Sequence, residues 1–268
     1  MWEIINGFGA YWALRAGLDL GLFDALEAGP LTTAELAVAI GVGDADDLAT
    51  LTNLLVALDL LDTDGVTWAL PDVARRFLVT GSAASMCDLV RLSPGVHDAW
   101  PDLAATLRVG GPDAATTEAT VALYPALVQA TAAMQQAVAA GVAGALAWGP
   151  RPVIVDLGCG SGAWLTALLD AAGPHARGIG VDLPHVVDSV RPARADLSVT
   201  LVAGDYLDAT LPVARADVVV LAHVLRAEPE SRARALVARA VDLLGPGGTL
   251  LVADYFVPGT GQPAEACP

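Results

Sequence analysis

The chain has 268 residues, of which 54% are hydrophobic, and a formal net charge of −16 that combines 30 acidic residues with 14 Arg and no Lys. Such an acidic surface repels the phosphates of nucleic acids and of anionic membranes, which argues against both as partners. The three cysteines, Cys87, Cys159 and Cys267, show neither a disulfide framework nor a metal-ligand spacing, which is typical of a cytoplasmic protein without a metal site.

Residues 1–80 carry helical patterns and one short β-like segment. Apolar residues recur at helical spacing over 4–26, a capping-box pattern begins at Thr32, and a further helix begins at Asp44. The sequence at 62–65 then predicts a hairpin turn. Helices followed by a hairpin indicate a winged helix, all-helical apart from that hairpin. The helix that would read DNA begins with three aspartates, so we predict a packing or dimerisation domain instead.

Residues 81–150 are expected to form a helical connector. Its part at 119–150 has no charged residue, which raises the alternative of a membrane span. This stretch consists mostly of Ala and Gly and contains Pro125, whereas Leu, Ile and Phe drive membrane insertion. We therefore predict a buried helix that packs closely on its neighbours, and no membrane partner.

Residues 151–268 alternate apolar strands with helices, which predicts a Rossmann-like α/β domain with a mostly parallel sheet. The sequence Pro-Gly-Gly at 246–248 predicts a tight turn that begins the last strand. The expected strands lie at 153–156, 177–181, 199–203, 217–222 and 249–255.

A glycine-rich turn follows the first of these strands, and most of the functional prediction depends on it. Asp156 ends the strand, and Gly158, Gly160 and Gly162 alternate after it. Glycines let the chain bend sharply and let a ligand lie against bare main chain. A helix begins directly after them, so its N-terminus faces the ligand. The pattern indicates a nucleotide-type site at the carboxyl end of the sheet.

Residues after the next two strands narrow the choice of nucleotide. Asp182 lies about twenty residues beyond the glycines, as the ribose-binding acid of an NAD dehydrogenase would, so that enzyme class is an alternative. A pyrophosphate is disfavoured beside the carboxylate of Asp156. Asp205 and Tyr206 offer a carboxylate and a ring, which suit the amino group and the face of an adenine.

Four motifs in this order resemble the class I O-methyltransferases that use S-adenosylmethionine. They are Val-Asp-Leu-Gly-Cys-Gly-Ser-Gly at 155–162, Val-Asp-Leu-Pro at 181–184, Gly-Asp-Tyr at 204–206 and Pro-Gly-Gly at 246–248. The segment at 18–24 and the winged-helix pattern are similar to the dimerisation domain of plant-type and bacterial members. Members of this family continue beyond the fifth strand, so we expect a sheet that lacks the final strands.

The resemblance implies a role for each residue of the cofactor site. Asp156 would contact the amino end of S-adenosylmethionine, Asp182 would accept both ribose hydroxyls, and Asp205 and Tyr206 would hold the adenine. The glycines would let the methionine part lie on the backbone. The full predicted set is Asp156, Gly158, Gly160, Gly162, Asp182, Leu183, Gly204, Asp205 and Tyr206.

In this family a His after the fourth strand removes the proton from the acceptor hydroxyl, and Arg226 stands at that position. Arginine stays protonated and cannot act as a general base. We therefore expect an acceptor that is already acidic, such as a phenol or enol, with Arg226 stabilising an oxyanion. His223 is a second candidate base, although a structural role at the strand end is favoured. Asp254 lies where relatives carry a supporting acid.

The resemblance also places the acceptor pocket in the connector, where His97, Trp100, Tyr124 and Met134 are candidate lining residues. The sequence thus predicts an S-adenosylmethionine-dependent O-methyltransferase of bacterial secondary metabolism, a homodimer through its N-terminal helices that acts on a small molecule. Two alternatives stay open. One is a family member that binds the cofactor but hydroxylates, decarboxylates or cyclises, and the other is a non-catalytic scaffold protein.

Overall fold

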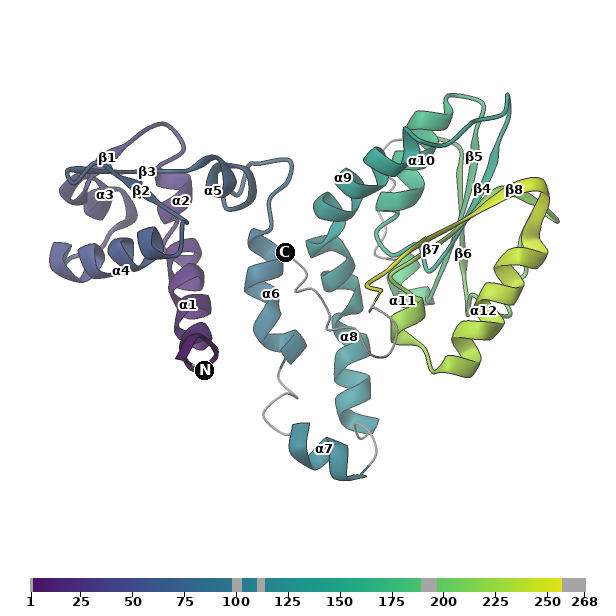
Figure 1. Ribbon diagram of the computed structural model, residues 1–268, viewed down its shortest axis with the longest axis horizontal. Helices are drawn as coiled ribbons and strands as arrows, with labels where there is room; N and C mark the ends of the chain where they lie inside the picture. The colour runs from purple at the N-terminus through teal and green to yellow at the C-terminus, as the bar shows by residue number, and fades with distance from the viewer. Residues whose placement is uncertain (1, 98–102, 110–113, 189–196, 257–268) are drawn as a thin grey trace. The chain divides into compact units, whose positions relative to one another are not determined.

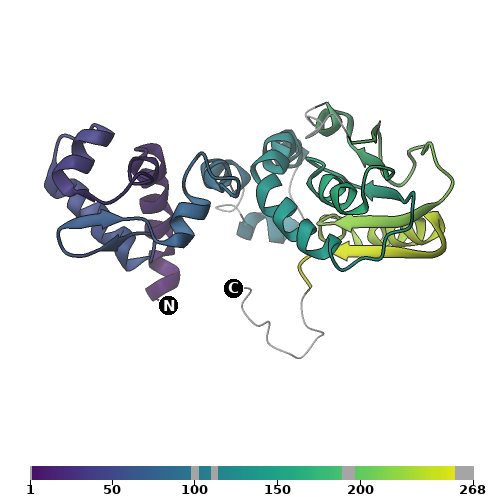
Figure 2. The same cartoon turned by 90° about the horizontal axis from the view of Figure 1, so that it is seen from above.

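The computed structural model describes residues 2–97, 103–109, 114–188 and 197–256. The chain divides into two compact units, Met1–Met134 and Gln135–Pro268. Figures 1 and 2 show them from two directions. Each unit contains hydrophobic core clusters of its own.

The first unit begins with helices around a core rich in leucine. The helical pattern expected over 4–26 is interrupted at Gly21, which has a φ of 71°. Glycine suits this position because a residue with a Cβ rarely adopts that conformation. Leu22, Leu36 and Leu55 are fully buried in this core. The helices are α1 (Trp2–Asp19), α2 (Leu22–Ala25), α3 (Thr33–Ile40), α4 (Ala45–Ala57) and α5 (Asp72–Phe77).

Two helix starts confirm the sequence predictions. The N–H of Thr32 donates to the carboxylate of Glu35 at 2.8 Å, and the N–H of Glu35 donates to the Thr32 hydroxyl at 3.3 Å. This is the predicted capping box. Asp44 caps α4 by accepting from the N–H groups of Asp46 and Asp47, so the aspartates that argued against DNA recognition serve to start this helix.

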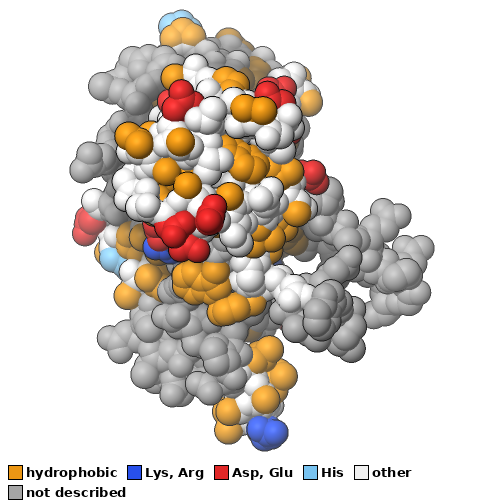
Figure 3. Space-filling view, turned by 90° about the vertical axis from the view of Figure 1, so that its left-hand side faces the viewer, with side chains coloured by type: hydrophobic (Ala, Val, Ile, Leu, Met, Phe, Trp, Pro, Cys, Tyr) orange, Lys and Arg blue, Asp and Glu red, His pale blue; other side chains and the backbone are white. Residues whose placement is uncertain are grey.

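A small antiparallel sheet with the order β1-β3-β2 completes this part of the unit. The predicted hairpin is formed by β2 (Asp62–Thr63) and β3 (Thr67–Ala69). The pairing of β1 (Leu31–Thr32) with β3 was not predicted, because two residues are too few to show a period. Figure 3 faces this unit and shows hydrophobic side chains interspersed with acidic ones. Phe8 and Val38 are strongly exposed, at 73% and 84%.

The connector is helical, as predicted. The buried helix expected at 119–150 is instead two helices, with Pro125 inside α8. Among their described side chains only Ala139 and Ala143 of α9 are fully buried, and the others are half-buried or exposed. Within the part of the chain that the structure describes, no helix is both long and apolar enough to cross a membrane. The helices are α6 (Cys87–His97), α7 (Leu103–Val109), α8 (Ala114–Ala130) and α9 (Ala132–Ala143).

A five-stranded parallel sheet forms the centre of the second unit, with the order β6-β5-β4-β7-β8. Since all strands run in one direction, their carboxyl ends lie at one edge of the sheet. The strands are β4 (Val153–Leu157), β5 (Arg177–Asp182), β6 (Val199–Ala203), β7 (Ala216–Ala222) and β8 (Leu244–Ala253).

Helices cover both faces of this sheet (Figure 1). Alternate residues of a strand point to opposite faces. Ile154 therefore packs in a cluster with α10 (Ala163–Ala172), whereas Val155 packs in a cluster with α12 (Glu230–Leu243). Burial on both sides explains why the strands read as apolar runs without a polar alternation. A short helix, α11 (Pro184–Val187), follows β5.

The tight turn predicted at 246–248 is not a turn between elements in the structure, which has a strand there. These residues lie within β8, where the pairing advances from Leu244 to Thr249 while β7 advances only from Ala216 to Val218. The extra residues form an irregularity in the strand, with Gly247 at a φ of 77°. A bulge and a turn need the same residue types, so the sequence pattern does not separate them.

Candidate functional site

The glycine-rich turn joins β4 to α10 at the carboxyl end of the sheet. Gly158, Gly160 and Gly162 have φ values of 88°, 52° and 76°, a region that residues with a Cβ rarely adopt. The N–H groups of Gly158 and Cys159 both donate to the carbonyl of Val181, at 2.8 and 3.0 Å. The turn is thereby tied to the end of β5. The predicted sharp bend is present, and its conformation favours glycine at three positions.

Asp156, on the strand that leads into this turn, is 1% exposed. Neither of its carboxyl oxygens has a hydrogen-bond partner among the described residues. Burial, assisted by the nearby charge of Asp182, raises the pKa of Asp156 to about 8. A buried carboxyl without a partner is costly. A cationic group of a ligand is the kind of partner that this site lacks.

Asp182 ends β5 and faces the same turn. Its two oxygens accept from the N–H groups of Gly160 and Leu183, each at 2.8 Å. Burial raises the pKa of Asp182, and these two hydrogen bonds oppose the rise. Because a carboxylate oxygen has two lone pairs, each oxygen keeps an acceptor position for a ligand hydroxyl. The N–H of Gly204 donates to the Asp182 carbonyl at 2.9 Å, which brings the loop after β6 to this place.

A network of charged groups holds the two residues predicted to bind adenine. Arg232 of α12 lies 2.9 Å from Asp205 and 2.7 Å from Glu228, and the hydroxyl of Tyr206 donates to Glu228. The N–H of Leu207, with Arg232, lowers the pKa of Asp205. Burial and Glu228 raise the pKa of Tyr206. The carboxylate and the ring are therefore fixed before any ligand enters.

Sequence reasoning missed Glu228 and Arg232. Their four-residue spacing is a signal of an ion pair at the start of a helix. Nothing in the sequence indicates that the pair also reaches Asp205, which lies 27 residues before Arg232. Only the packing of α12 against the sheet brings them together.

The segment after β7 packs against the glycine turn. A Cβ on Gly158 would lie 2.3 Å from Cγ1 of Val224, so Val224 sits directly over this glycine. His223 has a φ of 57°, and its N–H donates to the Ala253 carbonyl at 2.7 Å. Gly158 is thus required for packing as well as for the bend, and the residues around Val224 lie beside the turn.

The structure brings the three predicted catalytic residues together around one carboxylate. Arg226 places Nε 3.2 Å from Oδ1 of Asp254, and its backbone N–H donates to Oδ2 at 3.1 Å. Nδ1 of His223 lies 3.9 Å from Oδ1, beyond hydrogen-bond distance, and is buried without a partner in the described part of the chain. Burial, then the charge of Arg226, lowers the pKa of His223, although Asp254 opposes this. The acid pairs with the arginine rather than the histidine.

Residues 115–266 match the O-methyltransferase domain, and residues 2–80 match the O-methyltransferase dimerisation domain. This chain belongs to the O-methyltransferase family. Its dependence on S-adenosylmethionine and its Rossmann-like methyltransferase fold, both predicted from the sequence, are confirmed.

Similar proteins include enzymes of bacterial secondary metabolism. The chain is 32% identical over 260 residues to the tetracenomycin polyketide synthesis 8-O-methyl transferase TcmO of Streptomyces glaucescens, across 91% of this chain and 75% of that one. It is 31% identical over 260 residues to the N,N-dimethyltransferase OxyT of Streptomyces rimosus, across 91% and 74%. The crystal structure of CalO1, a methyltransferase in calicheamicin biosynthesis with SAH bound, is 26% identical with a TM-score of 0.81, across 98% and 81%.

The site geometry of this O-methyltransferase fits S-adenosylmethionine. The amino group of the cofactor is a cation, and the unpartnered carboxyl of Asp156 lacks one. The two remaining acceptor positions on Asp182 match a pair of ribose hydroxyls.

The residues predicted for the acceptor pocket belong to the first unit. Tyr124 of α8 and Met134 of α9 are both half-buried. His97 ends α6, but its side chain lies outside the described residues, as does Trp100 altogether. The structure therefore leaves their role as a prediction.

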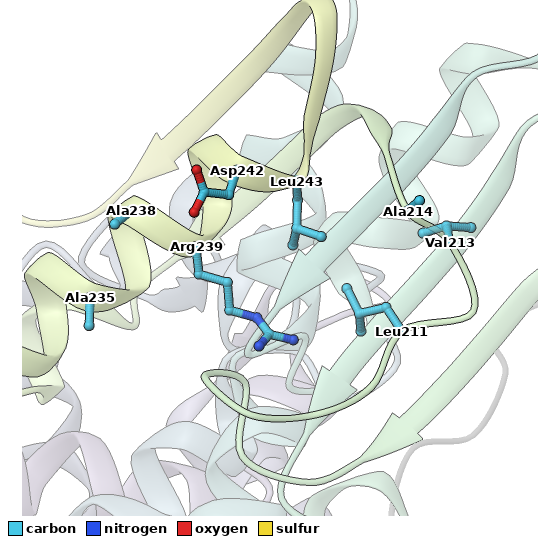
Figure 4. Close-up of a pocket in the computed structure, with 8 residues that line it drawn as sticks. All are labelled: Leu211, Val213, Ala214, Ala235, Ala238, Arg239, Asp242 and Leu243. Carbon is cyan, nitrogen blue, oxygen red and sulfur yellow. The ribbon is translucent and has the colours of Figure 1, made fainter.

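An open groove of about 570 Å³ lies elsewhere in the second unit, between α12 and the loop that leads into β7 (Figure 4). Arg239 extends from α12 across it and donates to the carbonyls of Leu207 and Ala209. None of the predicted site residues lines this groove. Its lining residues are Leu211, Val213, Ala214, Ala235, Ala238, Arg239, Asp242 and Leu243.

Proposed function

We propose that this O-methyltransferase transfers the methyl group of S-adenosylmethionine to an oxygen of a phenolic or enolic small molecule of bacterial secondary metabolism. The observation that supports this most is the buried, unpartnered carboxyl of Asp156 beside the three-glycine turn. When bound, the cofactor supplies an electrophilic methyl group on a positively charged sulfur. The similarity to TcmO, named as an 8-O-methyl transferase, supports an oxygen as the acceptor atom.

On the cofactor side, the residues bind and orient. Asp156 pairs with the amino end, and the glycine turn lets the methionine part lie against bare main chain. Asp182 accepts hydrogen bonds from the ribose hydroxyls. Asp205 accepts from the adenine amino group while Tyr206 packs on the ring. Leu183 and Gly204 complete the wall around the nucleoside.

On the acceptor side, the chain orients the acceptor for in-line attack. Arg226 stays protonated, so it removes no proton, and its guanidinium stabilises an oxyanion instead. Asp254 holds Arg226 in place. His223, with a pKa lowered by burial, is the second candidate to accept a proton. Correct placement of two reactants lowers a reaction barrier by about 7–11 kcal/mol, so an acidic acceptor is methylated without a strong base.

The acceptor pocket and the assembly complete the proposal. The role of His97, Trp100, Tyr124 and Met134 in the acceptor pocket stays a prediction from the family resemblance, and the dimerisation domain at 2–80 supports a homodimer. The buried free cysteines Cys87 and Cys159 fit the reducing conditions of the cytoplasm.

Two measurements test this function. Calorimetry with S-adenosylmethionine and with NAD compares the two nucleotides, and we expect heat of binding only with the first. Incubation with methyl-labelled S-adenosylmethionine and a panel of phenols and enols then tests transfer, and we expect label in an acidic acceptor. Binding of NAD alone would refute the cofactor assignment.

A second candidate function follows from Arg226. Because the usual base is replaced, the chain could bind the cofactor and catalyse hydroxylation, decarboxylation or cyclisation, or only act as a scaffold. Strong binding of S-adenosylmethionine without label in any acceptor would favour these candidates over methylation.

A further inference from the structure

The side chain of Arg226 is fixed at one end and open at the other. Its Nε and its backbone N–H engage the two oxygens of Asp254. Its guanidinium carbon lies 5.2 Å from the centre of the Tyr255 ring, which limits rotation of the group. The side chain is nevertheless 55% exposed, whereas that of Asp254 is 4% exposed.

The open end consists of the two Nη groups. A guanidinium has five N–H donors, of which one is on Nε and four are on Nη. Nε lies 3.2 Å from Oδ1 of Asp254 in the ion pair, and among the described residues no hydrogen bond or ion pair engages either Nη of Arg226. A planar fork of free donors matches the oxygens of an anion.

The position of this fork connects it to the cofactor side. Arg226 follows Val224 by two residues, and Val224 packs on Gly158 of the cofactor turn. An anion at Arg226 is therefore held by a segment that contacts the turn. Burial and the charge of Arg226 lower the pKa of His223, although Asp254 opposes this, so the ring is harder to protonate than a free histidine.

We propose, on the basis of the proposed methyl transfer, that the acceptor binds as an anion delocalised over two conjugated oxygens, one of which is held by the Nη groups of Arg226 while the other attacks. Acidic phenols with a conjugated acyl or nitro group and enols of 1,3-dicarbonyl compounds belong to this class. A second oxygen matters because hydrogen bonds to the attacking oxygen would weaken it as a nucleophile.

The charge balance of the reaction then requires no general base. A lone pair of the acceptor oxyanion forms the new oxygen–carbon bond as the carbon–sulfur bond breaks and its electron pair stays on sulfur. The negative charge of the acceptor and the positive charge on sulfur cancel. Since no proton leaves the acceptor, an arginine at the position of the family's histidine is consistent with catalysis.

Binding of 4-nitrophenol in the presence of S-adenosylhomocysteine tests this inference without turnover. The absorbance of the 4-nitrophenolate anion reports its ionised state on the protein, and 4-methylphenol serves as a weakly acidic probe of similar size. We expect the wild type to bind the nitrophenolate and Arg226→Gln to bind it about 10-fold to 100-fold more weakly. Arg226→Lys should recover part of the affinity, because it restores the charge without the fork.

Arg234→Gln is the matched control, since Arg234 is an exposed arginine of α12 that pairs with Glu230. It should bind nitrophenolate as the wild type does. S-adenosylmethionine affinity, measured by calorimetry, should be the same in all these variants and shows that each is folded. Equal nitrophenolate affinity in wild type and Arg226→Gln, or preference of the wild type for 4-methylphenol, would overturn the anion site.

Turnover with labelled S-adenosylmethionine separates this inference from the proposed function. We expect 4-nitrophenol and 1,3-cyclohexanedione to be methylated and 4-methylphenol to be a poor acceptor. Arg226→His should extend methylation to 4-methylphenol. If nitrophenolate binds through Arg226 but no acceptor receives label, the anion site stands and the methyl transfer is wrong.

Discussion

The cofactor side and the acceptor side of the site treat a buried carboxyl in opposite ways. Asp156 is 1% exposed and has no partner among the described residues. The side chain of Asp254 is 4% exposed, but both its oxygens are engaged by Arg226. A cation from outside the chain would satisfy the first carboxyl, whereas the chain itself satisfies the second. The acceptor side therefore has its acid already paired with Arg226, and what it offers a ligand is the two Nη groups of that arginine.

Asp182→Ala should break the cofactor side most severely. The change removes both acceptors for the ribose and leaves the N–H groups of Gly160 and Leu183 without their partner. We expect the affinity for S-adenosylmethionine, measured by calorimetry, to fall by about 100-fold or more. Asp188→Asn changes an exposed acid near the end of α11 and should have no effect. An unaltered affinity in Asp182→Ala would place the ribose elsewhere.

Gly158→Ala should disturb the contact between the two sides. The new Cβ would lie 2.3 Å from Cγ1 of Val224, at a φ of 88°. We expect the free energy of unfolding in urea to fall by about 2–4 kcal/mol, from backbone strain together with overpacking. Gly173→Ala is the control. Gly173 has a φ of 90°, and an added Cβ would meet nothing within 4 Å, so its loss of stability reports backbone strain without overpacking.

The double variant Gly158→Ala with Val224→Ala completes this test. Truncation of Val224 removes the clash, so the second change should cost less in the Gly158→Ala background than alone. Strict additivity of the two losses would show that the contact does not limit position 158.

Asp156 should make the cofactor side sensitive to pH. Its pKa is about 8 in the folded protein and about 3.9 in an unfolded chain, so the unliganded protein loses stability as pH rises from about 4 to about 8. The loss is on the order of 1 kcal/mol per pH unit. Urea unfolding of Asp156→Asn should show a flatter dependence of stability on pH, because asparagine does not titrate. Asp182 and Cys159 are present in both proteins, so they do not account for the difference.

Binding should show the opposite trend. A cationic amino group requires the ionised form of Asp156, so the affinity for S-adenosylmethionine should rise with pH up to about 8, by at most about tenfold per pH unit. The same pH profile in wild type and Asp156→Asn would contradict this role.

Arg232→Ala should have the smallest effect. The side chain is partly exposed, so its ion pairs with Asp205 and Glu228 are weakened by solvent. We expect a loss of about threefold to tenfold in affinity for S-adenosylmethionine, because Asp205 loses its fixed position. Arg232→Lys should recover part of it. A loss in Arg234→Ala of the same size would mean that the charge of α12, not this network, is responsible.

The sequence predicted those features that depend on local chemistry. Thr32 and Asp44 start helices because short polar side chains accept from free N–H groups nearby. Gly158, Gly160 and Gly162 mark the sharp turn because the positive φ values there favour glycine. Features with no local signal were missed, among them the pairing of β1 with β3.

What the sequence by itself determined is therefore the family, the order of the elements and the residue types at the ends of the strands. Only the tertiary structure decided that Val224 packs over Gly158, that Arg232 reaches Asp205, and that Asp254 binds Arg226. Each of these contacts joins residues far apart in the chain, so it depends on how the helices and strands pack. Periodicity and capping concern neighbours a few residues apart, and they contain no information on such contacts.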